Sequence, residues 1–522
     1  MKKHGLLKNV FTVGAFTALS RLLGLVREML QSRLIGAGVE QSAFVMAFAL
    51  PNMMRKLFGE GALTAAFVPV FKAECEKESI AKAARLARAV MTMMLLLLFA
   101  MVALGIGSLE AVRHFVIVSG STSERLRLIF EMVEIMLPYM IFICGAAFGM
   151  GVVNSLGYFK ASSFMPCLLN LFWIGSLAAL SFMPGYSVAM RVRLVAAAIL
   201  AAGLVQMLFM FWRMKKAGIN PLPSFHGWRD DNTRLVWRNL GIATLGAGAI
   251  QLNYMCDQIL AQLANSWAAG VIGYAERLMD LPLGIVGVAF GTVLLPTLSG
   301  HFAKNDFEGA QETLASSIKT LMFILIPSAG GIMILSREIT SLIYEGNQFD
   351  SMAVIRVSRA LAVYAVGLWC YGLQKTMIPW FQAQKDMKTP LKVTLRTVLL
   401  NFILNVIAVF SLPEEWRHVG LSASTVICSL AGCFMLLRMA RLANRDFRLA
   451  GLPAFVMKTI AATVVMSVAI WFLLPLLRSR LSFCNPVISS LMQLMAAIVC
   501  GLCIYLASAF AFGIRRIVPR HR

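Results

Sequence analysis

Long apolar runs separated by short polar loops occupy almost the whole chain. An apolar run of about 20 residues is long enough to cross a bilayer as a single helix. Fourteen such runs are predicted, with approximate bounds 8–33, 41–69, 89–109, 128–156, 163–183, 192–213, 235–264, 270–299, 316–336, 354–380, 390–411, 420–440, 454–476 and 487–513. The pattern therefore predicts an all-α polytopic membrane protein with 14 transmembrane helices.

The composition favours a membrane protein and excludes a soluble one. Of the 522 residues, 59% are hydrophobic and only 14% are charged, and the mean hydropathy is +0.76. Too few charged residues remain for a sizeable domain outside the membrane. The net charge of +23 would favour nucleic-acid binding in a soluble protein, but here it fits basic loops held against anionic lipid. We therefore expect contacts with membrane lipids and none with nucleic acid.

Lysine and arginine are concentrated in alternate loops, on the side of the membrane that carries both ends of the chain. Cytoplasmic loops are enriched in these residues, so both termini are predicted to be cytoplasmic. Lys2, Lys3 and Lys8 before an apolar run resemble a signal peptide. Because the run continues through Arg21 without a clear small-x-small cleavage site, we expect an uncleaved first span.

A weak internal repeat divides the chain. Pro69 and Pro296 each precede a polar, mixed-charge stretch, and the stretches that end at Pro166 and Pro390 are similar in character. Both pairs of prolines are separated by nearly the same number of residues, which indicates two six-helix lobes in the same orientation. Parallel repeats of this kind are a transporter architecture with the site between the halves. The predicted parts are residues 1–225 (N-lobe, spans 1–6), 226–447 (C-lobe, spans 7–12) and 448–522 (spans 13 and 14 with the C-terminal tail).

Sequence motifs of catalysis are missing. The chain has no Walker A, HExxH or GxSxG sequence and no metal-ligand cluster of His and Cys. It is therefore predicted to be a transporter without a cofactor or nucleotide hydrolysis, and a lipid enzyme built from scattered intramembrane groups is an alternative. The ten cysteines lie mostly in apolar runs, and Cys500 and Cys503 fit small apolar filler better than a redox or metal pair.

Besides the cations assigned to the loops, six fall inside predicted spans, where charge is expensive and usually faces a cavity or a partner. They are Arg21, Arg27, Arg55, Lys56, Arg277 and Lys375. The alternative explanation is structural: side chains that snorkel, or ion pairs such as those that the spacing allows between Lys56 and Glu60 and between Arg277 and Asp280.

Arginine suits phosphate because its planar fork binds bidentately and stays charged in a low dielectric. Arg21, Arg27 and Arg55 near one cavity would fit a diphosphate and would repel a cationic drug. On an ideal helix Arg21 and Arg27 point about 120° apart. Both can therefore serve one site only if the cavity is wide or the helix bends at Gly24.

Prolines are predicted to interrupt two spans. Pro51 and Pro69 lie in the second span, and Pro282 and Pro296 lie in the eighth. Breaks at matching places in the two halves suggest discontinuous helices that line the cavity.

A carboxylate, Asp257, lies midway along the span 235–264. A lone intramembrane carboxylate is a candidate H⁺ or Na⁺ site, and a satisfied polar contact between helices is the alternative. Gln382 and Asp386, at the end of the span 354–380, would join it if the two spans are adjacent.

Four stretches together resemble one family. SRLLGLVRE, GAG, ALPNMMRKLFGEGALTAAFVPVF and YAERLMDLPLGIVGVAFGTVLLPTLS are similar to the MurJ (MviN) family, within the multidrug/oligosaccharidyl-lipid/polysaccharide flippase superfamily. The resemblance covers essentially the whole chain. It implies a bacterial inner-membrane flippase that moves lipid II to the periplasmic face. Lipid II is the peptidoglycan precursor in which undecaprenyl diphosphate carries a disaccharide-pentapeptide head. The resemblance further implies alternating access between the two lobes and a groove of spans 13 and 14 for the lipid tail.

The resemblance also implies roles for single residues. The family's essential cavity arginines match Arg21, Arg27, Arg55 and Arg277, with Ser20, Lys56 and Glu60 in the same motifs. A Na⁺ site occurs in part of the family, and Asp257, Gln382 and Asp386 are the residues expected to match it, with Na⁺, H⁺ or membrane potential as the driving force. Where the family usually has Asp after GAG, this chain has Ser42, so that carboxylate is missing or is supplied by Glu40.

The predicted partner is lipid II, and we expect a monomer that works beside the cell-wall synthesis machinery. A flippase for another polyprenyl-diphosphate glycan is the first alternative, because the diphosphate is common to both substrates. A multidrug/cation antiporter of the same superfamily is the second, and it would need acidic rather than basic residues in the N-lobe cavity.

Overall fold

In the computed structural model, the regular secondary structure of the described residues is helical. These are residues 3–118, 124–183, 185–444, 447, 449, 451–482 and 485–514, and within helices the side chains of 3–11, 59–62, 64–65, 116–118, 285–292 and parts of 242–250 are outside the description. In this described part the only β-type pairing is an isolated bridge between Gly346 and Phe349. The predicted all-α fold is confirmed.

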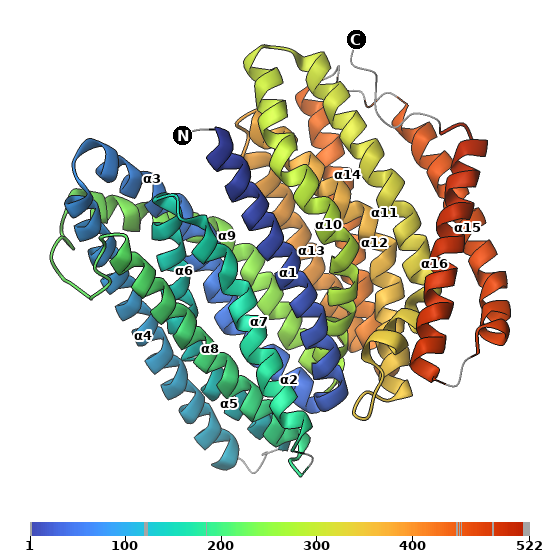
Figure 1. The fold of residues 1–522 in the computed structure, drawn as a ribbon, viewed down its shortest axis with the longest axis horizontal. Helices are drawn as coiled ribbons and strands as arrows, with labels where there is room; N and C mark the ends of the chain where they lie inside the picture. The colour runs from blue at the N-terminus through green and yellow to red at the C-terminus, as the bar shows by residue number, and fades with distance from the viewer. Residues whose placement is uncertain are drawn as a thin grey trace. The chain divides into compact units, whose positions relative to one another are not determined.

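The chain forms two compact units. The first contains Met1–Gln262 and Gly346–Phe349, and the second contains Leu263–Glu345 and Asp350–Arg522. The helices of the first unit are α1 (Lys3–Ile35), α2 (Val39–Met54), η1 (Arg55–Gly61), α3 (Ala62–Lys77), α4 (Ile80–Val118), α5 (Glu124–Met136), α6 (Tyr139–Ser155), α7 (Phe159–Ser181), α8 (Val188–Lys216) and α9 (Asp231–Ala264), the last of which ends just beyond the unit. Figure 1 follows them from blue to light green.

The second unit is built from seven long helices. They are α10 (Ala268–Ala303), α11 (Phe307–Tyr344), α12 (Ser351–Ala383), α13 (Lys388–Ser411), α14 (Arg417–Ala443), α15 (Leu452–Arg480) and α16 (Pro486–Ala511), with the short η2 (Glu414–Trp416) before α14. The division into 1–225, 226–447 and 448–522 stays a prediction, and in the two compact units α9 belongs with the helices that precede it.

Each predicted span coincides with a helix or a pair of helices, because α2 with α3 and α5 with α6 each form one span. In the described part, ten helical segments are long and apolar enough to cross a membrane. The protein is therefore a multi-pass membrane protein. The remaining four predicted spans are the ones that hold Arg21, Arg27, Arg55, Lys56, Asp257 and Arg277. The count of 14 stays a prediction.

The second span is interrupted, but not at its prolines. Pro51 lies inside α2 and Pro69 inside α3, and the break between these helices is the π-helical segment η1. In the eighth span the predicted breaks at Pro282 and Pro296 are wrong, because α10 runs through both as one helix. Proline is tolerated inside membrane helices when neighbouring groups satisfy the freed carbonyl, so its presence alone does not end one.

Apolar side chains of the first unit form one core. Phe67 packs on Phe71 and Phe148, with ring centroids 5.1 and 4.9 Å apart. α1 lies along α7, and α6 lies along α8. Aromatic pairs at these distances contribute roughly 0.5–1.5 kcal/mol beyond the burial of their area. The packing holds α1 and α7 as a rigid support for the polar side chains between them.

In the second unit, Trp380 on α12 is buried among Phe302, Phe307 and Phe447, with centroids 5.1–5.6 Å apart. A separate cluster joins α15 and α16 to α11, where the Tyr505 hydroxyl donates to the carbonyl of Phe323 (2.8 Å). Figure 1 shows α15 and α16 side by side. The two C-terminal helices are therefore attached to the second unit through α11.

The turn between α1 and α2 requires glycine. Gly36 has φ +83°, and a Cβ there would lie 2.1 Å from the carbonyl oxygen of Gln348. Other residues rarely adopt that backbone conformation, and none would fit against the carbonyl. The first glycine of the GAG sequence is thus explained by the close approach of the loop Gly346–Phe349, which belongs to the same unit.

Candidate functional site

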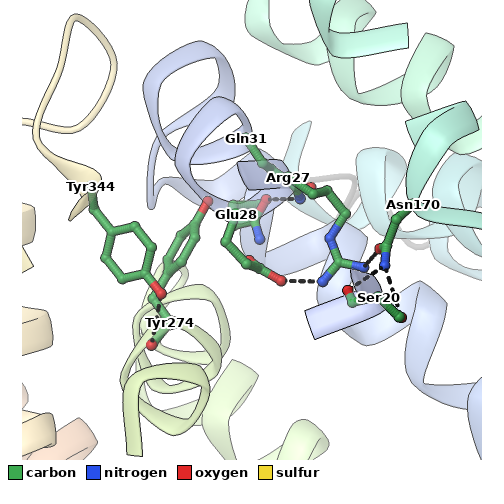
Figure 2. A network of polar contacts seen from close by, with 8 residues as sticks. Ser20, Arg27, Glu28, Gln31, Asn170, Tyr274 and Tyr344 are labelled. Atoms are coloured by element: carbon green, nitrogen blue, oxygen red, sulfur yellow. Dashed lines mark hydrogen bonds and ion pairs between the residues drawn. The ribbon is translucent and has the colours of Figure 1, made fainter. Parts of the chain in front are cut away.

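Arg27 on α1 lies in a polar network with α7. Its Nη1 donates to Asn170 Oδ1 (3.0 Å), its Nη2 pairs with the carboxylate of Glu28, and its Cζ lies 4.3 Å from the centre of the Trp173 ring. Figure 2 shows the guanidinium between Glu28 and Asn170. The side chains of Arg27 and Glu28 are only 12% and 13% exposed. The network fixes the direction of the guanidinium within the helix bundle.

The network is not fully satisfied. The Nε of Arg27 is buried and has no hydrogen-bond partner among the described residues. A buried donor without a partner costs about 1–3 kcal/mol, so an arginine retained in such a place needs a reason beyond stability. The Nε atoms of Arg125 and Arg213 are buried in the same way among the described residues, so the role of Arg27 in substrate binding stays a prediction.

Ser20 joins the same network through Asn170. The amide Nδ2 of Asn170 donates to the Ser20 carbonyl (3.0 Å) and approaches the Ser20 hydroxyl (3.4 Å). Asn170 therefore links Ser20 to Arg27 (Figure 2). A Cβ at Gly24 would lie 4.0 Å from Nδ2, an ordinary contact, so the amide does not require glycine there.

Arg21 has different surroundings from Arg27, as their predicted helical phase requires. Its side chain is exposed and lines a cavity of about 740 Å³ between α1, α3, α6 and α7. α1 runs without interruption past Gly24. Ser20 lies at the edge of this cavity and, through Asn170, in the Arg27 network.

Arg55 begins the π-helical segment η1 and is oriented by its own helix. Both its Nε and its Nη2 donate to Asn52 Oδ1, at 3.2 and 3.0 Å. Lys56 Nζ lies 5.3 Å from the centre of the Tyr254 ring on α9. Short π-helical segments are found frequently at functional sites. The side chain of Glu60, at the end of the same segment, lies outside the described ones.

Ser42, in place of the family's usual Asp, is buried and hydrogen-bonded. Gln262 Nε2 donates to its hydroxyl (3.0 Å) and its carbonyl (2.8 Å), while Arg125 donates to the Gln262 side chain (2.8 Å). Gln31 Nε2 also donates to Gln41 nearby in the chain (2.8 Å). Neutral amides thus satisfy this turn without a carboxylate at position 42.

The residues of the predicted Na⁺ site have separate local roles. Asp257 on α9 accepts from Asn253 Nδ2 (3.1 Å). Asp386 precedes α13 and accepts from the backbone of Lys388 and Thr389 (both 3.0 Å). The side-chain hydrogen bond from Thr389 contributes most to lowering the pKa of the Asp386 carboxyl, and the backbone N–H groups of Thr389 and Lys388 lower it further. Gln382 lies half-buried near the end of α12. Within the described part, no three His, Cys, Asp or Glu residues gather as a metal site would require, and the Na⁺ site stays a prediction.

Arg277 lies on α10 of the second unit with its side chain exposed, and Lys375 is exposed on α12. Beside Arg277, the carboxylate of Glu276 accepts from the Tyr364 hydroxyl (3.2 Å). The role of Arg277 as the counterpart of the arginines in the first unit stays a prediction. The structure brings together Ser20 and Arg27, and it places Arg21, Arg55 and Lys56 elsewhere in the same unit.

Comparison with known proteins decides the family. The family model described as "Lipid II flippase MurJ" matches residues 31–492. The chain belongs to the MurJ family. A protein of Burkholderia cenocepacia named lipid II flippase MurJ is 31% identical over 427 residues, covering 80% of each chain. The probable lipid II flippase MurJ of Vibrio cholerae is 30% identical and covers 98% of this chain and 97% of its own.

Solved structures confirm the fold of the MurJ family. A structure of the lipid II flippase MurJ in an inward closed conformation has a TM-score of 0.77 at 23% identity, and covers 96% of this chain and 98% of its own. An inward-facing multidrug resistance transporter of the MATE family has a TM-score of 0.64 at 17% identity, and covers 82% of this chain and 96% of its own. These likenesses concern the fold alone.

Several polar partners in this MurJ-family chain were not predicted from the sequence. Asn170 and Trp173 hold Arg27, Asn52 holds Arg55, and Tyr254 lies beside Lys56. Asn170 is an amide inside an apolar span, which is a signal that could have been used. Trp173 carried no such signal, because an aromatic residue in a membrane helix is ordinary.

Proposed function

We propose that this MurJ-family protein flips lipid II from the cytoplasmic to the periplasmic leaflet of a bacterial inner membrane by alternating access. The observation that carries the proposal is the guanidinium of Arg27, held nearly buried in a membrane helix by Glu28, Asn170 and Trp173 with one donor unused. An arginine kept at such a cost suits an anionic substrate. The curated relatives are named for lipid II, whose diphosphate supplies that anion.

The diphosphate and the sugar–peptide head together are proposed to be held by Arg21, Arg27 and Arg55 of the first unit and by Arg277 of the second. A guanidinium binds two phosphate oxygens at once, which a lysine ammonium cannot do with the same geometry. In the empty protein Glu28 neutralises Arg27. The substrate therefore competes with Glu28 for Arg27, and it meets no carboxylate at Arg21. Binding favours closure on the cytoplasmic side only through the difference in affinity between the two states.

The lipid tail is proposed to stay in the bilayer along α15 and α16. These helices present exposed apolar side chains, among them Val464, Trp471, Phe472 and Leu502. Burying each methylene of a polyprenyl tail contributes roughly 0.8 kcal/mol, so the tail has no reason to leave apolar surroundings. Only the polar head then needs a path through the protein.

The driving force is proposed to come from the membrane rather than from a nucleotide. Return of an empty, positively charged site is favoured by the membrane potential, at about 2.3 kcal/mol per charge and 100 mV. Na⁺ or H⁺ at Asp257, with Gln382 and Asp386, is the second proposed source. The protein acts as a transporter and not as an enzyme, as a monomer with cytoplasmic termini, beside the cell-wall synthesis machinery.

Depletion of the protein tests the function. Lipid II is expected to accumulate in the cytoplasmic leaflet, where a membrane-impermeant reagent added outside cannot reach it. Unchanged labelling, with another polyprenyl-diphosphate glycan trapped instead, would assign the protein to that glycan. Normal growth of a depleted strain that carries Arg55→Ala would remove the role proposed for Arg55.

A further inference from the structure

The cavity beside Arg21 lies entirely within the first unit and adjoins the Arg27 network at Ser20. It is lined by α1, α3, α6 and α7 and has a volume of about 740 Å³. Cavities of roughly 300–1,000 Å³ are typical of sites for small organic groups. Its size therefore suits a sugar or a short piece of peptide rather than a single ion.

Two cations line this cavity without a counter-charge. Arg21 on α1 and Lys72 on α3 are both exposed, and neither takes part in an ion pair or hydrogen bond within the described part of the chain. No Asp or Glu is among the described residues that line it. Two positive charges that share a cavity repel each other, and an anion between them relieves that repulsion. The cavity is thus prepared for an anionic group.

Hydroxyl groups also line the cavity, and they act as hydrogen-bond acceptors. Thr17 donates to the carbonyl of Val13 (2.8 Å), Ser155 to that of Gly151 (2.7 Å) and Ser163 to that of Phe159 (2.8 Å). A hydroxyl whose proton is used by its own helix can offer only oxygen lone pairs to a ligand. These residues therefore accept hydrogen bonds from N–H and O–H groups. The cavity favours a ligand that joins an anion to amides or hydroxyls.

The cavity lies near helix ends that are predicted to face the cytoplasm, the side from which the substrate is proposed to enter. Lys72 lies in the last turns of α3, and Phe159 begins α7, next to Lys160. The loops at these helix ends are the basic ones, which are predicted to be cytoplasmic. The N-terminus of α7 has no side-chain cap and adds its dipole to the positive charge.

We propose that this cavity receives a carboxylate of the substrate's sugar–peptide head, separate from the diphosphate, with Lys72 and Arg21 as its cations. The inference rests on the proposed function. A pentapeptide supplies both the carboxylate and the amide N–H groups that the cavity accepts. Lys72 then binds the sugar–peptide head of the lipid. Arg27 binds the phosphates, which every polyprenyl-diphosphate carrier has.

Binding to the purified full-length protein in detergent tests the inference. Two probes are compared, lipid II and undecaprenyl diphosphate without a sugar–peptide head. Lys72→Ala should weaken binding of lipid II about tenfold and leave that of undecaprenyl diphosphate unchanged, because only one charge-assisted contact is lost. Lys72→Arg should restore binding of lipid II.

Lys77→Ala is the matched control, since Lys77 is also exposed on α3 but does not line the cavity. Unchanged lipid II binding by Lys72→Ala, an equal loss for both probes, or an equal loss in Lys77→Ala would each overturn the inference. If the unmodified protein fails to bind lipid II, the proposed function itself fails. The two failures are therefore distinguishable.

Discussion

Two arginines on the same helix, Arg21 and Arg27, lie in unlike regions of the first unit. Arg27 is nearly buried and is held by a carboxylate, an amide and an indole ring. Arg21 is exposed in a cavity that it shares with Lys72 and with no acid among the described lining residues. The difference teaches that one arginine is fixed by the protein in advance, whereas the other is free to follow a ligand.

Alanine substitutions of Arg21 and Arg27 should show the largest difference between loss of flipping and loss of stability. Arg27→Ala and Arg21→Ala should both abolish growth of a flippase-depleted strain at normal protein level. Arg27→Ala should also lower the free energy of unfolding by about 1–3 kcal/mol, because Glu28 and Asn170 lose a buried partner. Arg21→Ala should change it by less than about 0.5 kcal/mol, as is usual for an exposed side chain. Thermal melting in detergent measures both, and equal shifts would contradict the comparison.

Lysine at the same two positions should sharpen the contrast. Arg27→Lys keeps the charge but loses the fork that contacts Glu28 and Asn170 while stacking on Trp173. Flipping should fall by at least about tenfold, the effect of one lost charged hydrogen bond. Arg21→Lys should retain flipping, because a point charge suffices in an open cavity. Reconstituted vesicles that report lipid II translocation measure this, and equal rescue at both positions would be the contrary result.

Removing the Asn170 amide, which joins Ser20 at the edge of the cavity to Arg27, should have a smaller effect on flipping. Asn170→Leu deletes the contacts to Ser20 and Arg27 while leaving both of these residues in place. Flipping should fall about fivefold, since a positioning hydrogen bond contributes about 1 kcal/mol. Ser176→Ala is the control, because the Ser176 hydroxyl donates to the carbonyl of Trp173 within the same helix and contacts neither Ser20 nor Arg27. If Asn170→Leu behaves like this control, the network does not position Arg27.

The aromatic contact should matter least. Trp173→Phe keeps a ring beside Arg27 but loses part of the cation–π contact, which contributes about 2 kcal/mol at a desolvated site. A two- to fivefold decrease in flipping is expected, measured in the same vesicles. Trp228→Phe, at an exposed tryptophan in the loop between α8 and α9, should have no effect. A complete loss in Trp173→Phe would show that the ring does more than support Arg27.

Much of the fold could be predicted from the sequence, because the thickness of the bilayer sets the length of apolar runs and membrane proteins keep Lys and Arg in cytoplasmic loops. The separation of Arg21 from Arg27 also followed from helical phase alone. The break at Arg55–Gly61 could not be located, since the sequence showed prolines on either side of it and the segment between them carried no signal. Pro282 and Pro296 of α10 led to a wrong prediction because proline weakens a helix, but only tertiary contacts decide whether the helix ends there.

The candidate site was predictable only in part. Arginine in an apolar span is conspicuous, so Arg21, Arg27 and Arg55 could be named. Their partners Asn170 and Trp173 come from a helix far along the chain, and their contact with Arg27 depends on how α7 packs on α1. Lys72 belongs to the polar, mixed-charge stretch after Pro69, and nothing in the sequence indicates that it shares a cavity with Arg21.

The most direct test of the account is the leaflet in which lipid II resides when Arg27 is the only residue changed. In cells depleted of their own flippase, this protein should restore labelling of lipid II by a membrane-impermeant reagent at the periplasmic face. Arg27→Ala, expressed to the same level, should leave lipid II unlabelled and trapped in the cytoplasmic leaflet. Full labelling with Arg27→Ala would contradict the claim that the fixed arginine of α1 carries the substrate's charge.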